Sequence, residues 1–458
     1  MSRPNVFFAA AVAALCLSPA SNAGDVRTAS ALRDRALNDP TAWNLLESLT
    51  EIGPRMVGTP QYLRARDWGI ARLKALGFAK VHAEAFAKPS WHRGGEAAEV
   101  VGPYPQKLAI VGLGGSPATP PNGVEAPVVV LRSYADLVAA RPNAFKGKIV
   151  VVNQPMTRTM DGSGYGAAVV ARYGASEAAK RGAVAYLVRS ISTGEGRAPH
   201  TGTAVNDNNN APPVPTAALG VPDADQLERM AARGPVRVRL RLASWSDPNS
   251  VAWNISGEIT GSAKPGEIVV IGGHLDSWDP GTGAIDDGAG VAITAAAASL
   301  IARLPQHPRR TIRMVMFGSE ESGGSSDAYL AAHRSELKNI VIVSEADLGS
   351  DRAYDVKLAA ANAPALAPLR AVLAPLRVFV SATPPTHGGS DVEGLHKAGV
   401  PIFSVDQDAT RYFDIHHSAD DTLAVVDRAQ LNQNVAVMAS VVYLTADSNV
   451  DFRTKPGN

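Results

Sequence analysis

The chain has 458 residues, of which 45% are hydrophobic and 19% are charged, so it can bury a large core and is neither disordered nor fibrous. Its length predicts two domains or one elaborated domain. The 44 lysines and arginines almost balance the 43 aspartates and glutamates, and no long run of one sign could follow a phosphate backbone or an anionic membrane. We therefore expect neither nucleic acid nor a membrane as a partner.

The N-terminal segment has the features of a secretory signal peptide. An apolar run from Val6 to Leu17 precedes Ser21 and Ala23, small residues at the minus three and minus one positions of a cleavage site. The run is shorter than the roughly 20 residues needed to span a bilayer. We expect residues 1–23 to be removed, together with the only cysteine, Cys16. The mature protein would then be soluble, in the periplasm or outside the cell.

The next segment predicts the opening of an α/β unit. Helical patterns alternate with short breakers, and a strand pattern follows, at Val26 to Leu37, Ala42 to Ile52, Gln61 to Leu76 and Lys80 to Phe86.

Residues 98–245 show a different sequence pattern. Short predicted strands rich in β-branched residues are separated by turns that contain Gly, Pro and Asn. The expected strands are Ala126 to Leu131, Lys148 to Val152, Ala183 to Val188 and Val236 to Leu242. The polar run Asn206 to Asn210 is expected to be an exposed loop. We predict that residues 98–245 form a β-rich insert domain, and that residues 24–97 and 246–458 together form one discontinuous domain.

From Asn254 onward strands again alternate with helices. The predicted strands are Glu267 to Ile271, Thr311 to Phe317, Asn339 to Ser344 and Val400 to Val405. The predicted helices are Ala289 to Leu304, Ser325 to His333, Pro364 to Leu376 and Ala429 to Tyr443. This rhythm predicts an α/β fold with a mainly parallel central sheet and helices on both faces. In such a sheet, ligands bind at the carboxyl ends of the strands.

Acidic and imidazole side chains follow three consecutive strands of this sheet and recur near the C-terminus. In chain order they are His274 and Asp276, Asp286 and Asp287, Glu320 and Glu321, Glu345 and Asp347, and finally His416, His417, Asp420 and Asp421. Any one group alone is typical of a solvated loop, but the repetition at successive strand ends indicates a shared site.

Imidazole with carboxylate and no thiolate suits zinc, and also manganese or cobalt. A pair of metals about 3.5 to 4 Å apart usually shares a carboxylate. A calcium site would explain the carboxylates but not the two histidines, because calcium takes oxygen ligands.

Three motifs resemble those of the co-catalytic zinc exopeptidases, the family of bacterial leucyl aminopeptidases, glutamate carboxypeptidases and glutaminyl cyclases. They are GGHLDS followed by a G-A-x-D-D block, S-E-E after an apolar strand, and H-S-x-x-D-T near the end. The segments SEADLG, GGSD, AGVP and HHS are most similar to the plasma glutamate carboxypeptidase branch. The resemblance covers residues 50–90 and 250–445. It implies the zinc exopeptidase fold for the α/β part of the chain.

The resemblance implies two zinc ions per chain, with manganese or cobalt as alternatives. His274 and Asp347 would bind one ion. Glu321 and His417 would bind the other. Asp286 would bridge the two ions.

The same resemblance implies catalytic roles for two further carboxylates. Glu320 would be the general base, and Asp276 would orient the His274 ring through its other nitrogen. Asp421 would play a similar part near His417. His416 is the less favoured ligand, because the H-S-x-x-D-T motif begins at the second histidine.

We therefore expect a metallopeptidase that hydrolyses short peptides from a free end. A dipeptidase is favoured, and an aminopeptidase of the same family is the alternative. A glutaminyl cyclase, which as a family trait uses one zinc, and a non-catalytic binding protein are less consistent with five retained ligands and Glu320.

End specificity stays open, because Glu345 and Asp391 would suit a free amine whereas Arg411 and Lys397 would suit a free carboxylate. The insert resembles a protease-associated domain in its position in the chain and in its sequence pattern. Such a domain could limit access to the cleft or provide a dimer surface. A homodimer is expected from the resemblance.

Overall fold

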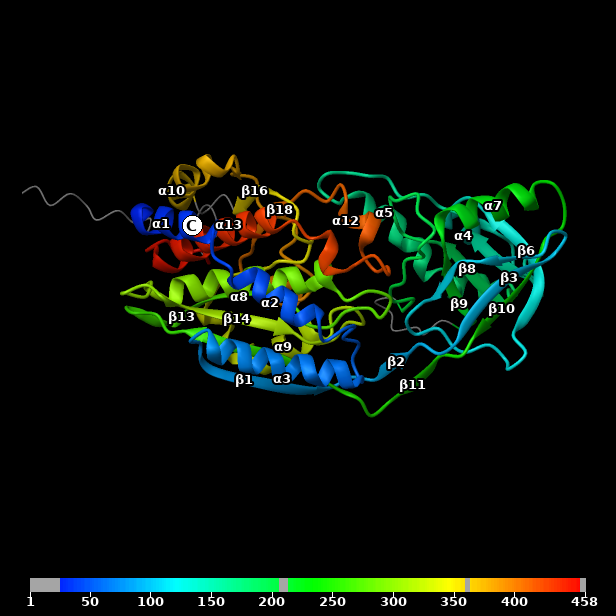
Figure 1. The fold of residues 1–458 in the computed structure, drawn as a ribbon, viewed down its shortest axis with the longest axis horizontal. Helices are drawn as coiled ribbons and strands as arrows, with labels where there is room; N and C mark the ends of the chain where they lie inside the picture. The colour runs from blue at the N-terminus through cyan, green and yellow to red at the C-terminus, as the bar shows by residue number, and fades with distance from the viewer. Residues whose placement is uncertain (1–24, 206–212, 359–362, 454–458) are drawn as a thin grey trace, which may run out of the picture.

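The structure is a computed structural model, and it describes residues 25–205, 213–358 and 363–453 (Figure 1). The predicted signal peptide, residues 1–23, and the polar run at 206–210 lie outside the described residues. The described chain forms two lobes, each built on its own sheet (Figure 1).

The first lobe contains a five-stranded sheet in the order β1-β12-β14-β13-β15. Its strands are β1 (Ala79–Ala87), β12 (Val251–Ile259), β14 (Arg310–Phe317), β13 (Lys264–His274) and β15 (Ile340–Glu345). Strand β13 pairs in parallel with both β14 and β15, whereas β12 and β1 run antiparallel at one edge. The three strands that precede the acidic motifs are therefore parallel neighbours, and their carboxyl ends meet at one edge of the sheet.

The central strands are apolar on both faces because helices cover both. In β13, Val269 and Ile271 join the larger core, whereas Ile268 and Val270 join the smaller core on the opposite face. The larger core includes residues of α1 (Val26–Ala36), α2 (Thr41–Thr50), α3 (Pro60–Ala75), α8 (Ala289–Ala302), α10 (Ala363–Leu373) and α13 (Arg428–Asp447). The smaller core contains residues of α9 (Ser325–His333) and α11 (Glu393–Lys397). The predicted α/β fold class is confirmed.

Helix α8 is central to this core. Together with the preceding turn it forms a segment, Ala284–Ala302, that is long and apolar enough to cross a membrane. An 18-residue stretch of this segment is entirely buried inside the protein, which is typical of a core helix.

A three-stranded sheet continues the first lobe beyond β15. Its strands are β16 (Ala353–Leu358), β17 (Phe379–Ser381) and β18 (Phe403–Gln407), and a parallel bridge between Val343 and Ile402 connects it to β15. This sheet leads the chain to the short helix α12 (Tyr412–Ile415), after which His416 and His417 follow.

The second lobe contains an eight-stranded sheet in the order β4-β3-β10-β6-β7-β8-β9-β5. Its strands are β3 (Glu96–Gly102), β4 (Gln106–Leu108), β5 (Ile110–Gly112), β6 (Val124–Leu131), β7 (Ile149–Val152), β8 (Ala185–Arg189), β9 (Thr216–Leu219) and β10 (Arg237–Leu242). It also contains α4 (Tyr134–Ala139), α5 (Gly164–Val169), α6 (Ala175–Lys180) and α7 (Val221–Ala231). We use "insert" for residues 98–245, which include helices as well as the expected strands.

Two features join the insert to the first lobe. A two-stranded ribbon of β2 (Ser90–His92) and β11 (Trp245–Asp247) carries the chain out and back (Figure 1). The insert also packs on α12, where the Ser192 hydroxyl donates to the main-chain oxygen of Phe413 at 2.8 Å and Arg158 pairs with Asp414 at 2.8 Å. The insert therefore lies against the segment that carries His416 and His417.

Candidate metal centre and active-site cleft

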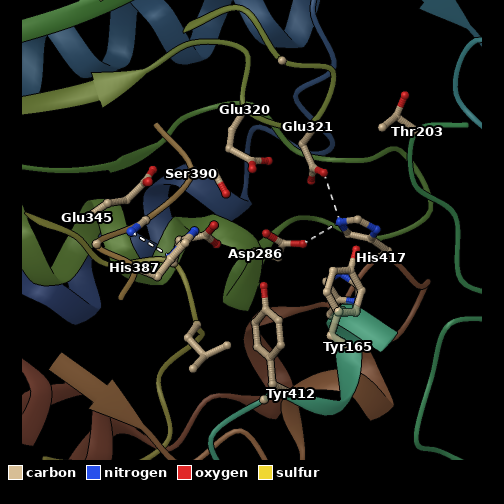
Figure 2. A pocket seen from close by; sticks show the side chains of 18 of the residues that line it. Tyr165, Thr203, Asp286, Glu320, Glu321, Glu345, His387, Ser390, Tyr412 and His417 are labelled. Carbon is tan, nitrogen blue, oxygen red and sulfur yellow. Dashed lines mark hydrogen bonds and ion pairs between the residues drawn. The ribbon is translucent and has the colours of Figure 1, made fainter. Parts of the chain in front are cut away.

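The imidazole and carboxylate groups predicted from the sequence converge around Asp286. One oxygen of Asp286 lies 3.1 Å from His274 Nε2, and the other lies 3.0 Å from His417 Nε2. His274 Nε2 is also 3.6 Å from an oxygen of Asp347, and His417 Nε2 is 3.0 Å from an oxygen of Glu321. Figure 2 shows the Asp286 carboxylate pointing toward the His417 ring, with Glu321 beside it. Asp286 thus lies between two groups, each of one imidazole and one further carboxylate.

Buried contacts fix the turn that carries Asp286. The guanidinium of Arg55 is fully buried and donates to the main-chain oxygens of Leu275, Thr282 and Gly283. An oxygen of Asp421 accepts the N–H groups of Ala284 and Ile285, both at 2.8 Å. Asp421 was expected to act near His417, but its carboxylate instead holds the chain immediately before Asp286.

A second buried carboxylate fixes the end of β13 relative to the start of α8. Asp287 accepts the N–H of His274 at 2.8 Å through one oxygen and the N–H of Gly290 at 3.0 Å through the other. Because both oxygens are used by the main chain, Asp287 orients the strand end that presents His274.

Asp276 contacts both His274 and Glu320. The nearest acceptor for His274 Nδ1 is the main-chain oxygen of Asp276 at 2.9 Å, whereas its carboxylate oxygen is 3.6 Å away, beyond hydrogen-bond distance. The carboxylate accepts the N–H of Glu320 at 3.0 Å instead. Asp276 therefore holds the His274 ring mainly through its backbone and the Glu320 loop through its side chain.

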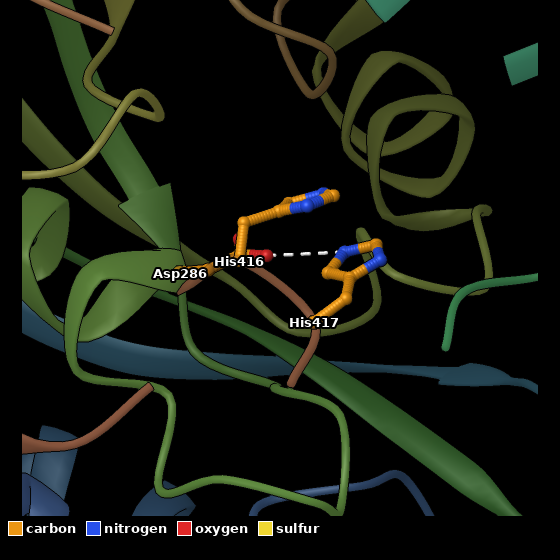
Figure 3. Close-up of side chains that lie close together, drawn as sticks. All are labelled: Asp286, His416 and His417. Atoms are coloured by element: carbon orange, nitrogen blue, oxygen red, sulfur yellow. Dashed lines mark ion pairs between the residues drawn. The ribbon is translucent and has the colours of Figure 1, made fainter. Parts of the chain in front are cut away.

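The two adjacent histidines differ in what they face. His417 directs Nε2 at the carboxylates, and its Nδ1 lies 3.3 Å from the main-chain oxygen of Thr201 in the insert. The His416 ring stacks on that of His417 with centroids 3.6 Å apart (Figure 3). Its buried Nδ1 has no hydrogen-bond partner within the described ranges. Of the pair, His417 is the one that contacts both Asp286 and Glu321.

The electrostatics of this cluster favour bound positive charge. Burial raises the pKa of Glu320 to about 7 and that of Glu321 to about 8, because their charged forms lose hydration and face other carboxylates. Burial alone would lower the pKa of His417, but Glu321 and Asp286 raise it to about 10. Glu321 Oε1 is buried and has no hydrogen-bond partner among the described residues. Two imidazoles, several carboxylates and a free carboxylate oxygen fit zinc, and cations between them would remove the repulsion.

The cluster opens into a cavity of about 1440 Å³ that both lobes line. The first lobe contributes Glu320, Glu345, His387 and Tyr412, and the insert contributes Tyr165, Arg172 and Thr203 among others. Figure 2 shows the Glu320 carboxylate and the Tyr412 hydroxyl directed toward Asp286 from different sides. The insert residues of the cavity could not be predicted from the sequence. The contacts that bring them there join segments more than 200 positions apart, as between Arg172 and His417.

The candidates for recognising a peptide end lie in different places. Glu345 lines the cavity, and one of its oxygens accepts the N–H of Asp391 at 2.8 Å. Arg411 pairs with Asp351 at 2.7 Å, and Lys397 pairs with Glu393 at 3.2 Å; neither lines the cavity. Of the two acidic candidates, Glu345 therefore lines the cavity and Asp391 contacts it from behind the lining, whereas neither basic candidate lies there.

Comparisons with known proteins find similar sequences over most of the chain. Residues 254–442 match the model of peptidase family M28. Carboxypeptidase Q of Bos taurus is 40% identical over 400 residues, which cover 86% of this chain and 83% of that protein. Carboxypeptidase Q of Homo sapiens is 38% identical with the same coverage.

Solved structures extend the likeness to the whole fold. A peptidase M28 precursor from Shewanella amazonensis has a TM-score of 0.90 and 40% identity, and the match covers 94% of this chain and 99% of that one. The zinc aminopeptidase BSAP from Bacillus subtilis has a TM-score of 0.63 at 19% identity, covering 88% of this chain and 94% of that one, which shows a shared fold.

Proposed function

The chain belongs to peptidase family M28 and is a metallopeptidase, and on that premise we propose that it is a dinuclear zinc exopeptidase acting on short peptides. The observation that carries the proposal is the placement of Asp286, which lines the cavity, between two imidazole–carboxylate groups. The preferred activity is that of a dipeptidase like the carboxypeptidase Q relatives. Its substrates would be small enough to enter between the insert and the first lobe.

The residues that would hold the metals follow from the contacts around Asp286. His274 and Asp347 would bind one zinc ion, Glu321 and His417 the other, and Asp286 would bridge them. When bound, the ions would lower the pKa of a shared water toward about 7 and polarise the scissile carbonyl. Manganese or cobalt would fit the same donor set.

Glu320 is proposed as the general base. Its main-chain N–H is held by Asp276, and its carboxylate points into the cavity with no hydrogen-bond partner among the described residues (Figure 2). It would accept a proton from the attacking water and return it to the departing amine. The hydroxyl of Tyr412, on the opposite side of Asp286, would donate a hydrogen bond to the carbonyl oxygen as negative charge develops there.

A specific observation favours recognition of a free amine. Glu345 is 7% exposed and lines the cavity, and its Oε1 has no hydrogen-bond partner among the described residues. A carboxylate with an unpartnered oxygen, on a residue that lines a cavity, suits an ammonium group. We propose that Glu345, supported by Asp391, receives the substrate's α-amine, as required both of a dipeptidase and of the alternative aminopeptidase.

Hydrolysis of three forms of one dipeptide tests the function. Alanyl-leucine, its N-acetyl form and its C-terminal amide are incubated with the purified mature protein, and metal content is determined on the same sample. Cleavage of only the doubly free dipeptide, with about two zinc ions per chain, supports a dipeptidase. Cleavage of the amide as well supports the aminopeptidase, and no bound metal would overturn the proposal.

Export is part of the proposal, because residues 1–23 have the pattern of a signal peptide. Expression of the full chain in a bacterium with a periplasm, followed by fractionation and N-terminal sequencing, tests it. A mature N-terminus near Gly24 in the periplasmic fraction supports export. An intact N-terminus in the cytoplasm would contradict it.

A further inference from the structure

Besides the cleft, a small cavity borders three of the proposed metal ligands. Its volume is about 10 Å³, close to the minimum that one water molecule requires. Three parts of the chain line it: Trp278, Gly281, Gly283 and Asp286, then Glu321, and finally His417, Ser418 and Asp421. Because Asp286, Glu321 and His417 line the cleft as well, a molecule in the small cavity can act directly on the side chains proposed to bind metal.

Among the lining residues, a buried donor and a buried acceptor lack partners. Trp278 Nε1 and Glu321 Oε1 have no hydrogen-bond partner among the described residues. Asp286 Oδ2 is the third such atom of the lining, but it lies 3.0 Å from His417 Nε2 and is one of the oxygens assigned to a metal. Leaving a buried polar group unpaired is unfavourable. The indole N–H and the Glu321 oxygen are therefore complementary groups on one cavity.

A metal ion in the small cavity would not satisfy Trp278. The indole nitrogen carries a hydrogen and acts only as a donor, so it cannot ligate a cation. A water molecule can accept a hydrogen bond from the indole N–H and donate one to a carboxylate oxygen at the same time. The size of the cavity and its unpartnered groups therefore favour a water molecule as its occupant.

The insert and the first lobe together hold the indole in place. Gly114 of the insert packs so closely on the ring that a Cβ at this position would lie 2.2 Å from Trp278 Cη2. The next residue along the chain, Asp279, pairs with Arg93 through both carboxylate oxygens, each at 2.8 Å. The Trp278 ring also meets the His417 ring edge-on, with centroids 5.9 Å apart. The indole therefore has little room to turn toward another acceptor.

A hydrogen bond to Glu321 Oε1 would determine how this carboxylate meets a metal. The other oxygen, Oε2, lies 3.0 Å from His417 Nε2 and so faces the second proposed ligand of the same ion. With Oε1 engaged by a donor, only Oε2 is left for the ion. A carboxylate that uses one oxygen fills one coordination position instead of two, which leaves a position for water or substrate.

We propose that Trp278 is a positioning residue whose indole N–H holds Glu321 Oε1 through one water molecule and so limits Glu321 to one oxygen toward its metal. The inference rests on the proposed dinuclear metal site and deepens it, because it names a contact that orients one ligand. It also gives the insert a part in metal binding, since Gly114 seats the indole.

Metal binding by Trp278→Phe tests the proposal without relying on activity. Phenylalanine keeps an aromatic ring but has no N–H group. The weaker of the two zinc ions, measured by competition with a chromophoric chelator, should bind about tenfold to a hundredfold less tightly than in wild type, and the other should change by less than about threefold. Unchanged affinity for both ions would overturn the proposal.

Trp91→Phe is the matched control. Trp91 lies in the ribbon between the lobes, and its indole N–H donates to the main-chain oxygen of Ser116 at 2.9 Å, away from the small cavity. Its replacement also removes an indole N–H at the junction of the lobes, but both zinc affinities should stay within about threefold of wild type. An equal loss in the two variants would show that packing between the lobes, and not the contact to Glu321, sets metal affinity.

Two further measurements separate positioning from packing. Cobalt, which fits the same donor set, has visible absorption bands that depend on its coordination geometry. These bands should change in Trp278→Phe, and bands identical to those of wild type would refute the effect on Glu321. Gly114→Ala should weaken the same zinc site because its Cβ displaces the indole, whereas Gly196→Ala, in the insert with nothing within 4 Å of its Cβ, should not. If Trp278→Phe does not fold, Gly114→Ala decides.

A crystal structure of the zinc-loaded wild type gives the direct readout. One water molecule within about 3.2 Å of both Trp278 Nε1 and Glu321 Oε1 is expected, and a metal ion in its place, or no contact between these groups, would overturn the proposal. If wild type binds no metal, the proposed function fails, and the structure of the metal-free protein still shows whether the water joins the two groups. If wild type and Trp278→Phe bind two zinc ions equally tightly, the function stands and the role of Trp278 is refuted.

Discussion

Replacing Arg55 would test how the turn before Asp286 is maintained. Its guanidinium is fully buried and donates to three main-chain oxygens on the loop between β13 and α8, at Leu275, Thr282 and Gly283. A hydrogen bond to a charged group contributes about 1.5 to 3 kcal/mol. Because the three bonds share one group, their loss is less than additive, and we expect Arg55→Met to destabilise the protein by about 3 to 5 kcal/mol.

Urea denaturation followed by tryptophan fluorescence, with metal content measured on the same preparations, would give both expected effects. Arg55→Met should unfold at lower urea concentration and should retain less metal, because the same loop carries Asp276 and Asp286. Arg411→Met is the matched control: its pair with Asp351 is half-exposed, so a change of less than about 1 kcal/mol is expected. A similarly small change for Arg55→Met, with full metal content, would refute the reasoning.

Three further predictions concern the site and acid stability. Glu320→Gln should keep about two metals per chain while kcat falls by several orders of magnitude; surviving activity would show that the base is misassigned. Asp286→Ala should lose metal and stability together, as measured by metal analysis and thermal unfolding, and unchanged stoichiometry would argue against a bridge. Burial alone would raise the pKa of Glu258, but hydrogen bonds from Lys80 and Arg313 lower it below its ordinary value. Its stabilisation is present above that ordinary value, about 4.3, and is lost as pH falls through the folded pKa. Stability of wild type should therefore fall more steeply below pH 5 than that of Glu258→Gln, and parallel curves would contradict this.

Much of the fold was predictable because the spacing of hydrophobic residues along the chain distinguishes helices from strands. The helix predicted at Ser325 to His333 matches α9, and the strand predicted at Thr311 to Phe317 matches β14 within one residue. Strand β12 (Val251–Ile259) was missed, because VAWNISGEI mixes polar and small residues and shows no apolar run or clear alternation. Its identity as a strand comes from pairing with β1 and β14, which local sequence does not encode.

The candidate ligands were predictable for a different reason: residues after parallel strands meet at one sheet edge. The structure brings His274, Glu321 and Asp347 together there. Sequence could not place Asp421, which contacts main-chain groups far away in the chain, at Ala284 and Ile285.

Arg172 could not be recognised from the sequence as a residue of the cavity, for the same reason as Asp421. Its approach to His417 joins residues 245 positions apart on two lobes. The local sequence pattern thus identifies candidate ligands that follow the strands. Contacts between the two lobes depend on the complete fold and cannot be read from it.

The central claim is that two metals share Asp286. Crystals of the zinc-loaded mature protein, measured on both sides of the zinc absorption edge, would locate the ions directly by anomalous scattering. The account predicts two peaks about 3.5 Å apart, one on each side of the Asp286 carboxylate, with His274 and Asp347 at one and Glu321 and His417 at the other. A single peak, or a peak ligated by His416 in place of His417, would contradict it.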